Sequence, residues 1–427
     1  DSSSPTKLHL NWMKDIPDST KLSEITIPGT HDTAALYGIC CARTQIWTIQ
    51  EQMNSGLRYF DLRLRLYNDT LRAFHAFIDQ KKTFDVFLKA ANEFLENNPT
   101  EAIIFEIICE YEIKNCKKDI HELYDDYTKD YKDKIVVYNG NNLTLGEIRG
   151  KMLMIQVFHG STRSINNFII QNKWTCNIRA YINDKKRVIK SHFRRCINVN
   201  DGHTIFLNYL SCSSDYLLMT PFTAATFCNK IPFRYTGRLG IVLMDYPGED
   251  TIEHLINQNF AEKVEKKVIK SGNIVTVSHN DIDKYLHISN EKGVNEVFCR
   301  KEPMIWTITH KEGKETFKVG DYIILTNGDL KEEFYIDRTY LDEDKGKNIK
   351  EGTLFALKIS RDNAWKYMNS SYLKKDRKKN YLFNFSDSIE DTYGAYFTIE
   401  FTNYENLDCN EAKIISQKPL LEDALIS

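Results

Sequence analysis

Two histidines and one arginine lie at the ends or on the faces of short β-type runs near the start of the chain. His31 and Asp32 directly follow a run that ends in Pro-Gly-Thr, and another short run ends in His75. Between them, charged and apolar residues alternate with period two, which places Asp61 and Arg63 on one face of a strand. Because parallel barrels carry their chemistry at the carboxyl ends of strands, we expect these side chains to form one site.

The residue types in this set fit phosphodiester chemistry. One imidazole can deprotonate an attacking hydroxyl while the other protonates a leaving alcohol, since histidine titrates near neutral pH. A guanidinium keeps its charge and binds two phosphate oxygens at once. A single histidine at a strand end is more often a structural residue, so the prediction depends on the combination of His31, Arg63 and His75.

The first part of the chain has an α/β pattern, in which short buried runs alternate with segments of helical period. A helix is predicted from the apolar spacing of residues 84–95, which Asn-Pro at 98–99 ends, and a second apolar stripe over residues 252–268 predicts a helix that closes the domain. The predicted strands are Ile25–Pro28, Leu57–Leu62, Leu71–Phe74, Ala102–Ile108, Met152–Val157, Thr204–Leu210 and Leu239–Met244.

After residue 270 the pattern changes to short β runs separated by Asn, Gly and Asp turns, which predicts an all-β domain over 271–404 and a tail over 405–427. A loose repeat of about forty residues favours a β-trefoil, with a β-sandwich as the alternative. The repeat pairs the runs Tyr285–Ile288, Tyr322–Leu325 and Trp365–Met368 with Trp306–Ile308, Phe355–Leu357 and Phe397–Ile399.

Composition narrows the class of protein. The 57 Lys and Arg residues nearly balance the 59 Asp and Glu residues, so the net charge offers no general attraction to nucleic acid. No apolar run is long enough to span a bilayer, so any membrane contact should be peripheral. Ten cysteines without a CxxC motif argue against a zinc site. Together with four Asn-x-Ser/Thr sequons they favour secretion over a cytoplasmic location, which we do not exclude; the sequons are Asn68, Asn142, Asn369 and Asn384.

Several motifs in register resemble the X domain of phosphatidylinositol-specific phospholipase C, in its bacterial, metal-independent form. The resemblance runs from about Trp12 to Phe260. Its motifs are Ile-Pro-Gly-Thr-His-Asp at 27–32, Arg-Tyr-Phe-Asp-Leu-Arg at 58–63, His75, Asn-Pro-Thr-Glu-Ala-Ile-Ile at 98–104, and the runs 146–153, 208–214 and 239–246.

The resemblance implies a distorted TIM barrel over residues 1–270 and assigns roles to five residues. His31 would be the general base, oriented by Asp245, and His75 the general acid. Arg63 would stabilise the phosphate, with Asp32 positioning Arg63 and completing the acid side. The products would be a cyclic phosphodiester and diacylglycerol, and Arg63 would replace the metal ion of calcium-dependent relatives, so no cofactor is expected.

Head-group contacts depart from the family pattern. Ala76 stands where the family usually has glycine, and Arg179 where we would align an acidic ring contact. We expect Asp61, Tyr181 and Asn208 to contact the substrate, which would be an inositol phospholipid or a glycosylated-inositol lipid at a membrane surface. The head group, the disulfide pairing and the oligomeric state do not follow from the sequence.

Two alternative functions remain at this point. In one, the barrel is a catalytically inert scaffold that binds lipid or glycan, and the C-terminal domain recognises a glycan or protein. In the other, the chain is a metal-dependent phosphodiesterase of the sphingomyelinase D type. That enzyme would need a carboxylate cluster for magnesium, which Asp61 beside Arg63 does not supply. The combination of His31, Asp32, Arg63, His75 and Asp245 favours the phospholipase C-type enzyme.

Overall fold

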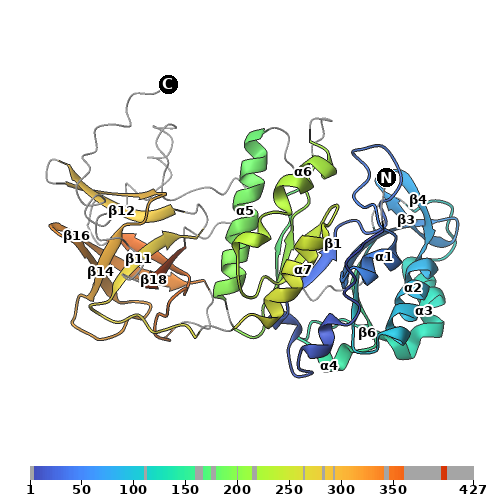
Figure 1. The fold of residues 1–427 in the computed structure, drawn as a ribbon, viewed down its shortest axis with the longest axis horizontal. Coiled ribbons are helices and arrows are strands. Elements are labelled where there is room, and N and C mark those ends of the chain that lie inside the picture. The colour runs from blue at the N-terminus through green and yellow to red at the C-terminus, as the bar shows by residue number, and fades with distance from the viewer. Residues whose placement is uncertain are drawn as a thin grey trace. The chain divides into compact units, whose positions relative to one another are not determined.

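A parallel β-sheet carries most of the candidate site residues. In the computed structural model the chain divides into two units, residues 1–263 and 264–427, each of which is described by itself (Figure 1). The description covers residues 4–109, 113–158, 167–174, 179–199, 201–213, 219–262, 265–280, 284–291, 294–340, 346–359 and 396–401.

The strands of the N-terminal unit are buried apolar runs, as expected for a parallel sheet covered by helices. Its path runs β6-β7-β5-β2-β1-β10-β9-β8, and every neighbouring pair along this path is parallel. The bounds are β1 Ile27–Thr30, β2 Tyr59–Tyr67, β5 Ile103–Cys109, β6 Ile135–Val137, β7 Met152–Val157, β8 Phe168–Gln171, β9 Ile205–Tyr209 and β10 Ile241–Met244.

Glycine is required in β1, because a Cβ atom at Gly29 would lie 2.4 Å from the carbonyl oxygen of Tyr59 in β2. The Pro-Gly-Thr-His motif therefore lets two strands approach closely at the site.

The sheet is curved like part of a barrel, but β6 and β8 at its two edges are not paired with each other among the described residues. Side chains span this gap: the hydroxyl of Tyr138 donates to Asn167 Oδ1 at 2.7 Å, and its ring meets Phe168 edge-on. The expected α/β architecture is confirmed as a half-barrel of parallel strands.

The sequence suggested that the run ending in His75 is a parallel strand of the barrel, but in the structure this run is antiparallel to its neighbours. β3 (Thr70–His75) pairs antiparallel with β2, and β4 (Ile78–Thr83) pairs antiparallel with β3. The reason is the turn at Asn68 and Asp69, whose positive φ angles of 50° and 53° are those of a tight hairpin. His75 therefore reaches the site from a hairpin attached to β2.

Helices flank the sheet (Figure 1). The predicted helix over 84–95 is present as α2, whereas the final helix is shorter than its apolar stripe suggested, because α7 ends at Asn257 and gives way to a 3-10 turn. The bounds are α1 Ile49–Asn54, α2 Phe84–Asn97, α3 Ile120–Thr128, α4 Leu145–Ile148, α5 Arg179–Asn198, α6 Pro221–Cys228 and α7 Glu249–Asn257, with 3-10 turns η1 Trp12–Asp15, η2 Leu22–Glu24, η3 Lys129–Lys134, η5 Pro232–Arg234 and η6 Gln258–Phe260. Among the described residues, none of these helices has the length and apolar character to cross a membrane.

The C-terminal unit is an antiparallel sheet that closes on itself, because β11 pairs with β14 on one side and with β18 on the other. The bounds are β11 Ile274–His279, β12 Lys284–Glu291, β13 Val294–Arg300, β14 Ile305–His310, β15 Tyr322–Asn327, β16 Leu330–Thr339, β17 Phe355–Ile359 and β18 Phe397–Phe401. The all-β prediction is confirmed. The choice of trefoil stays a prediction, since Trp365–Met368 in the third repeat and the tail over 405–427 lie outside the described residues.

The chain enters this unit before residue 270, the expected boundary. Val268 and Lys270 already form β-bridges with Lys350 and Thr316 of the C-terminal unit.

Candidate active site

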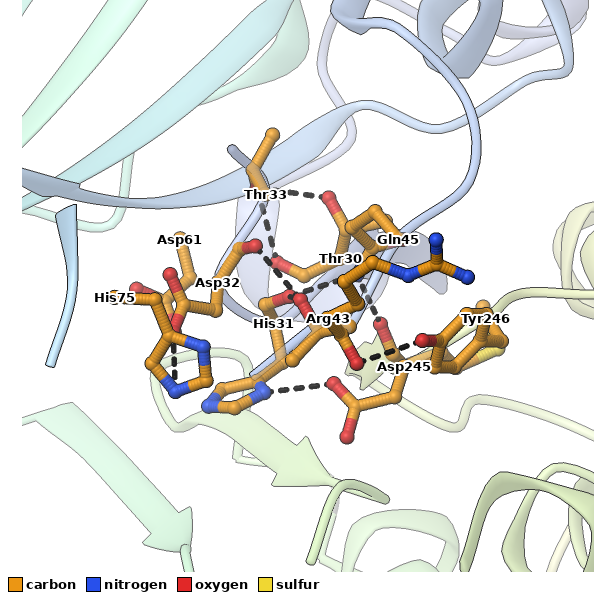
Figure 2. Close-up of polar contacts among 12 residues, drawn as sticks. Thr30, His31, Asp32, Thr33, Arg43, Gln45, Asp61, His75, Asp245 and Tyr246 are labelled. Atoms are coloured by element: carbon orange, nitrogen blue, oxygen red, sulfur yellow. Dashed lines mark hydrogen bonds and ion pairs between the residues drawn. The ribbon is translucent and has the colours of Figure 1, made fainter. Parts of the chain in front are cut away.

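His31 lies directly after β1, and its side chain forms an ion pair with Asp245. Its backbone N–H donates to the carbonyl oxygen of Met244 in β10, and its Nδ1 lies 2.7 Å from Asp245 Oδ1 (Figure 2). A carboxylate only accepts hydrogen bonds, so the neutral ring carries its proton on Nδ1 and keeps a lone pair on Nε2. Burial lowers the pKa of His31, but the nearby Asp245 carboxylate outweighs this and leaves the pKa raised above its usual value.

Asp245 is buried, and a hydrogen bond to its backbone carbonyl holds it in place. It follows β10, its side chain is 2% exposed, and its carbonyl oxygen accepts a hydrogen bond of 2.9 Å from Asn229 Nδ2 at the end of α6. The arrangement resembles the carboxylate–imidazole half of a catalytic triad, in which the acid fixes the tautomer and orientation of the base.

His75 has a different set of partners. Its Nδ1 lies 2.5 Å from the carbonyl oxygen of Ala42, which can only accept, so this nitrogen carries a proton. Its Nε2 lies 3.4 Å from Asp32 Oδ2. Asp32 is fully buried, and burial raises its pKa although His75 and then Arg63 act in the opposite direction. With Nδ1 bonded to a carbonyl, Nε2 is the nitrogen of His75 that faces Asp32.

Arg63 is held by Asp61, the residue two positions earlier on the same face of β2. The Arg63 guanidinium donates from Nε at 3.3 Å and from Nη2 at 3.1 Å to the two oxygens of Asp61, which is fully buried. Neither oxygen of Asp32 has a hydrogen-bond partner among the described residues. Asp61 therefore holds Arg63, and Asp32 forms an ion pair with His75.

Residues 42–45 form hydrogen bonds with several residues of the site, although no pattern in the sequence indicated this. Besides the bond from His75 to Ala42, the Tyr246 hydroxyl donates to the Arg43 carbonyl at 2.7 Å and Thr44 Oγ1 donates to the Asp32 carbonyl at 2.9 Å. Gln45 Nε2 donates to the carbonyl of His31 at 2.7 Å. Figure 2 shows this segment among the loops that carry the two histidines and Asp245.

Three residues in the loops of the site have a left-handed backbone conformation. Asp32, Ala76 and Tyr246 have φ angles of 45°, 52° and 44°, and each directly follows a proposed catalytic residue. This conformation costs a residue with a Cβ atom roughly 1–2 kcal/mol. It explains why glycine, which the family usually has there, suits position 76.

We expect Ala76→Gly to stabilise the protein. The variant removes left-handed strain but adds freedom to the unfolded chain, which leaves a net gain of about 0.5–1 kcal/mol in the free energy of unfolding. Denaturant titration of both proteins measures the difference. As a matched control, Ala73→Gly in the buried part of β3 should destabilise by about 1 kcal/mol. A loss of stability at position 76 equal to that at position 73 would contradict the strain argument.

The expected substrate contacts Tyr181 and Asn208 are not both brought to this site. Asn208 is fully buried, its carboxamide donates to the Ile189 carbonyl of α5 at 3.2 Å, and its Oδ1 accepts from Gln171. It therefore faces the helix and not the histidines. Tyr181 lies in the first turn of α5, and its side chain is outside the described residues.

Tyr209 is the residue of β9 that faces the site. Its ring meets His31 edge-on with centroids 5.8 Å apart. Its hydroxyl donates to Glu106 Oε2 at 3.3 Å, and the Tyr59 hydroxyl donates to the same oxygen at 2.9 Å. These buried residues hold the ring of Tyr209 against His31, the proposed base.

Among the described residues, no group of three or more His, Cys, Asp or Glu side chains is arranged to hold a metal ion. The cation next to the two histidines is the guanidinium of Arg63, paired to Asp61.

Known proteins are similar to the part of the chain that carries most of these residues. Residues 18–137 match the family model described as PI-PLC X 1. A 1-phosphatidylinositol phosphodiesterase of Listeria monocytogenes is 28% identical over 279 residues, covering 58% of this chain and 84% of that protein. A protein of the same name from Staphylococcus aureus strain Newman is 24% identical over 301 residues, covering 60% of this chain and 96% of that protein.

Solved structures show the same fold. Phosphatidylinositol-specific phospholipase C from Listeria monocytogenes aligns with a TM-score of 0.51 at 24% identity, covering 60% of this chain and all of that one. A mutant form of the enzyme from Staphylococcus aureus aligns with a TM-score of 0.55 at 22% identity, covering 61% of this chain and all of that one.

Proposed function

We propose that this chain, which belongs to the PI-PLC X domain family, is a phospholipase C-type phosphodiesterase of inositol lipids. Its relatives from Listeria monocytogenes and Staphylococcus aureus are named 1-phosphatidylinositol phosphodiesterases. The substrate would be phosphatidylinositol or a glycosylated-inositol lipid, and the products a cyclic inositol phosphate and diacylglycerol.

The observation that carries the proposal is the difference between the partners of the two histidines. His31 Nδ1 is bonded to the Asp245 carboxylate, which leaves Nε2 with a lone pair for a proton. His75 Nδ1 is bonded to a carbonyl, and its Nε2 faces Asp32 Oδ2 at 3.4 Å. One ring is therefore suited to act as base and the other as acid at the same pH.

In the first step, a ring hydroxyl next to the phosphate gives its proton to His31 Nε2 as its oxygen attacks phosphorus. The bond from phosphorus to the glycerol oxygen breaks, and that oxygen takes the proton from His75 Nε2. Asp245 stabilises the imidazolium of His31 as it forms. The ring now carries a cyclic phosphate, and diacylglycerol leaves with its hydroxyl restored.

Arg63 would stabilise the negative charge that develops on the phosphate oxygens. Asp61 fixes the guanidinium through two hydrogen bonds, so the positive charge is in place before the reaction and costs no reorganisation. We propose Asp61 as a positioning residue for Arg63 on this ground, and Asp32 as the partner of the acid.

A lipid panel in chelator tests the proposal. With EDTA present, phosphatidylinositol or a glycosylated-inositol anchor should be cleaved, and phosphorus NMR should detect a cyclic phosphate product, because Arg63 supplies the positive charge at the phosphate. Sphingomyelin with magnesium serves as the comparison. Turnover that EDTA abolishes and calcium restores, or hydrolysis of sphingomyelin alone, would show that the reaction is a different one.

The alternative of an inert scaffold requires a damaged site. His31, Asp32, Arg63, His75 and Asp245 are all present, and each has a partner suited to its proposed role. No observation favours the sphingomyelinase D alternative.

We further propose that the C-terminal unit recognises a glycan or a protein and that the chain acts outside the cell. Cys212, in the N-terminal unit, is disulfide-bonded, as suits an oxidising compartment.

A further inference from the structure

Two adjacent cysteines lie next to the residue that orients the proposed acid. Cys40 is exposed, Cys41 is partly exposed, and both are free thiols. They occupy the two central positions of a turn that the Ala42 N–H closes by donating to the Ile39 carbonyl at 2.8 Å. The carbonyl of Ala42 accepts the hydrogen bond from His75 Nδ1. We call residues 39–42 the dithiol turn; its last residue holds the acid.

Hydrogen bonds anchor the chain on both sides of the dithiol turn. Before it, the Tyr37 N–H donates to Oε1 of the buried Gln80 at 2.9 Å, and Gln80 Nε2 donates to the Tyr37 carbonyl at 3.2 Å. After it, the Arg43 carbonyl accepts from the Tyr246 hydroxyl at 2.7 Å. A change of backbone conformation at the cysteines is therefore confined between these anchors, and Ala42 lies within that stretch.

A disulfide between these two neighbouring residues requires the backbone of the turn to move. The peptide bond between Cys40 and Cys41 is trans. Consecutive Cα atoms are about 3.8 Å apart across such a bond, whereas the Cα atoms of most disulfides are about 4.4–6.8 Å apart. Joining Cys40 to Cys41 therefore rotates the backbone of the dithiol turn and displaces the Ala42 carbonyl. Such a strained and exposed disulfide is also reduced more easily than a structural one.

We propose that Cys40 and Cys41 are a redox modification site, at which a low-molecular-weight disulfide joins the two thiols and thereby moves the Ala42 carbonyl away from His75. The Cys40 thiolate attacks one sulfur of the reagent, and one small thiol leaves. The Cys41 thiolate then attacks Cys40 Sγ, and the second small thiol leaves. The two cysteines lose two protons and two electrons, which the reagent takes up as it becomes two thiols. The effect on catalysis rests on the proposed function, whereas the formation of the disulfide does not.

Displacement of the Ala42 carbonyl should affect the acid and spare the base. His75 Nδ1 loses its acceptor, and the ring can then turn away from the leaving oxygen. His31 keeps its contacts with Asp245 and with Gln45 Nε2, which lie outside the dithiol turn. Because a misplacement of about 1 Å lowers a rate by up to about a hundredfold, we expect kcat/KM on phosphatidylinositol to fall about tenfold to a hundredfold on oxidation.

The test compares two redox states of the full chain. The protein is equilibrated with oxidised glutathione, assayed, and assayed again after mild reduction with dithiothreitol. Mass spectrometry of the peptide that carries residues 40 and 41 should show the loss of two hydrogen atoms in the oxidised state. Cleavage of phosphatidylinositol should fall on oxidation and return on reduction. A nitrophenyl inositol phosphate, whose leaving group needs little protonation, should be cleaved at nearly the same rate in both states.

Two variants serve as controls. The double variant Cys40→Ser, Cys41→Ser cannot form the disulfide and should cleave phosphatidylinositol at the rate of the reduced parent in both buffers. Cys116→Ser removes another free thiol of the N-terminal unit, one that accepts a hydrogen bond from the Asp69 N–H at 3.3 Å, and should respond to oxidation like the parent. The ring signals of His75 in NMR spectra, identified by their absence in His75→Ala, should shift on oxidation of the parent but not of the double variant.

The results with the two substrates decide whether the disulfide acts on His75. A disulfide that forms without slowing lipid cleavage, or that slows both substrates equally, overturns the inference, because the effect then does not act through the acid. Oxidation that yields only mixed disulfides with glutathione or disulfide-linked dimers also overturns it, since Cys40 and Cys41 then do not join. If neither redox state cleaves inositol lipid, the proposed function is rejected and the NMR signals of His75 decide alone: a shift on oxidation supports the inference, and unchanged signals overturn it.

Discussion

Replacing His31 by alanine should slow cleavage of every substrate, whatever its leaving group. Without the base, the attacking hydroxyl keeps its proton, and the expected loss in kcat/KM is the ~10²–10⁴-fold typical of a missing general acid or base. His75→Ala should cause a loss of similar size with a natural lipid, whose alkoxide leaving group needs a proton.

A leaving group that is stable as an anion should distinguish the two histidines. With a nitrophenyl inositol phosphate, the departing phenolate needs little protonation, so His75→Ala should recover most of its activity while His31→Ala should not. Steady-state kinetics of both variants on both substrates measure the contrast. Equal recovery of the two variants, or no recovery of either, would mean that the roles of acid and base are wrongly assigned.

Asp245→Asn should follow His31→Ala in this comparison, and its pH profile gives a second readout. The base works when neutral, so kcat/KM falls as pH drops below the pKa of His31. Burial lowers that pKa, and the carboxylate of Asp245 more than offsets it. Removing the charge leaves burial unopposed, so the acid limb of the profile should move to lower pH while the maximal rate decreases. If the acid limb of the pH profile does not move, Asp245 does not have its proposed role.

The elements that the sequence predicted correctly are those with a repetitive signal. β5, β7 and β10 are continuous buried apolar runs, and α2 has the spacing of an amphipathic helix. The motif around His31 also predicted its position at the end of a strand, although β1 includes Pro28 and Gly29 and ends at Thr30, two residues later than expected.

The hairpin of β3 and β4 and the segment of residues 42–45 could not be predicted in the same way. β3 is as apolar as a parallel strand, and only the positive φ angles at Asn68 and Asp69 show that the chain reverses. Ala42 and Arg43 act through their backbone carbonyls, which leave no trace in residue type.

Asn208 contacts the Ile189 carbonyl of α5, whereas the ring of the next residue, Tyr209, contacts His31. Successive residues of a strand face opposite sides, so an assignment that is off by one residue moves a side chain from the pocket to the helix. Tyr209 is in register with Leu243, two residues before Asp245, and therefore shares its face. The resemblance suggested Asn208 as a substrate contact, and the register places Tyr209 on the face of His31 and Asp245.

Arg63→Ala should be the most damaging change outside the histidines. The Arg63 guanidinium is the cation closest in role to a metal ion at the phosphate, and loss of one preorganised charge stabiliser typically costs roughly 10²–10³-fold in kcat. Arg63→Lys keeps the positive charge but cannot bind two phosphate oxygens at once as a guanidinium does, so it should recover only part of the loss. Asp61→Asn should lower kcat less than Arg63→Ala, because the guanidinium remains but is held less firmly.

Two further measurements make the Arg63 prediction specific. Arg72→Ala is a matched control, because Arg72 is paired with Asp79 within the hairpin at 2.8 Å, and its loss should change kcat less than threefold. Guanidinium ions added to Arg63→Ala should restore part of the activity in a saturable way, since the cavity left beside Asp61 has the shape and charge partner for this ion, and should leave His31→Ala unchanged. Rescue of Arg63→Ala by calcium with no effect of guanidinium would indicate that a metal ion takes this role, and full activity of Arg63→Ala without any addition would remove Arg63 from the reaction.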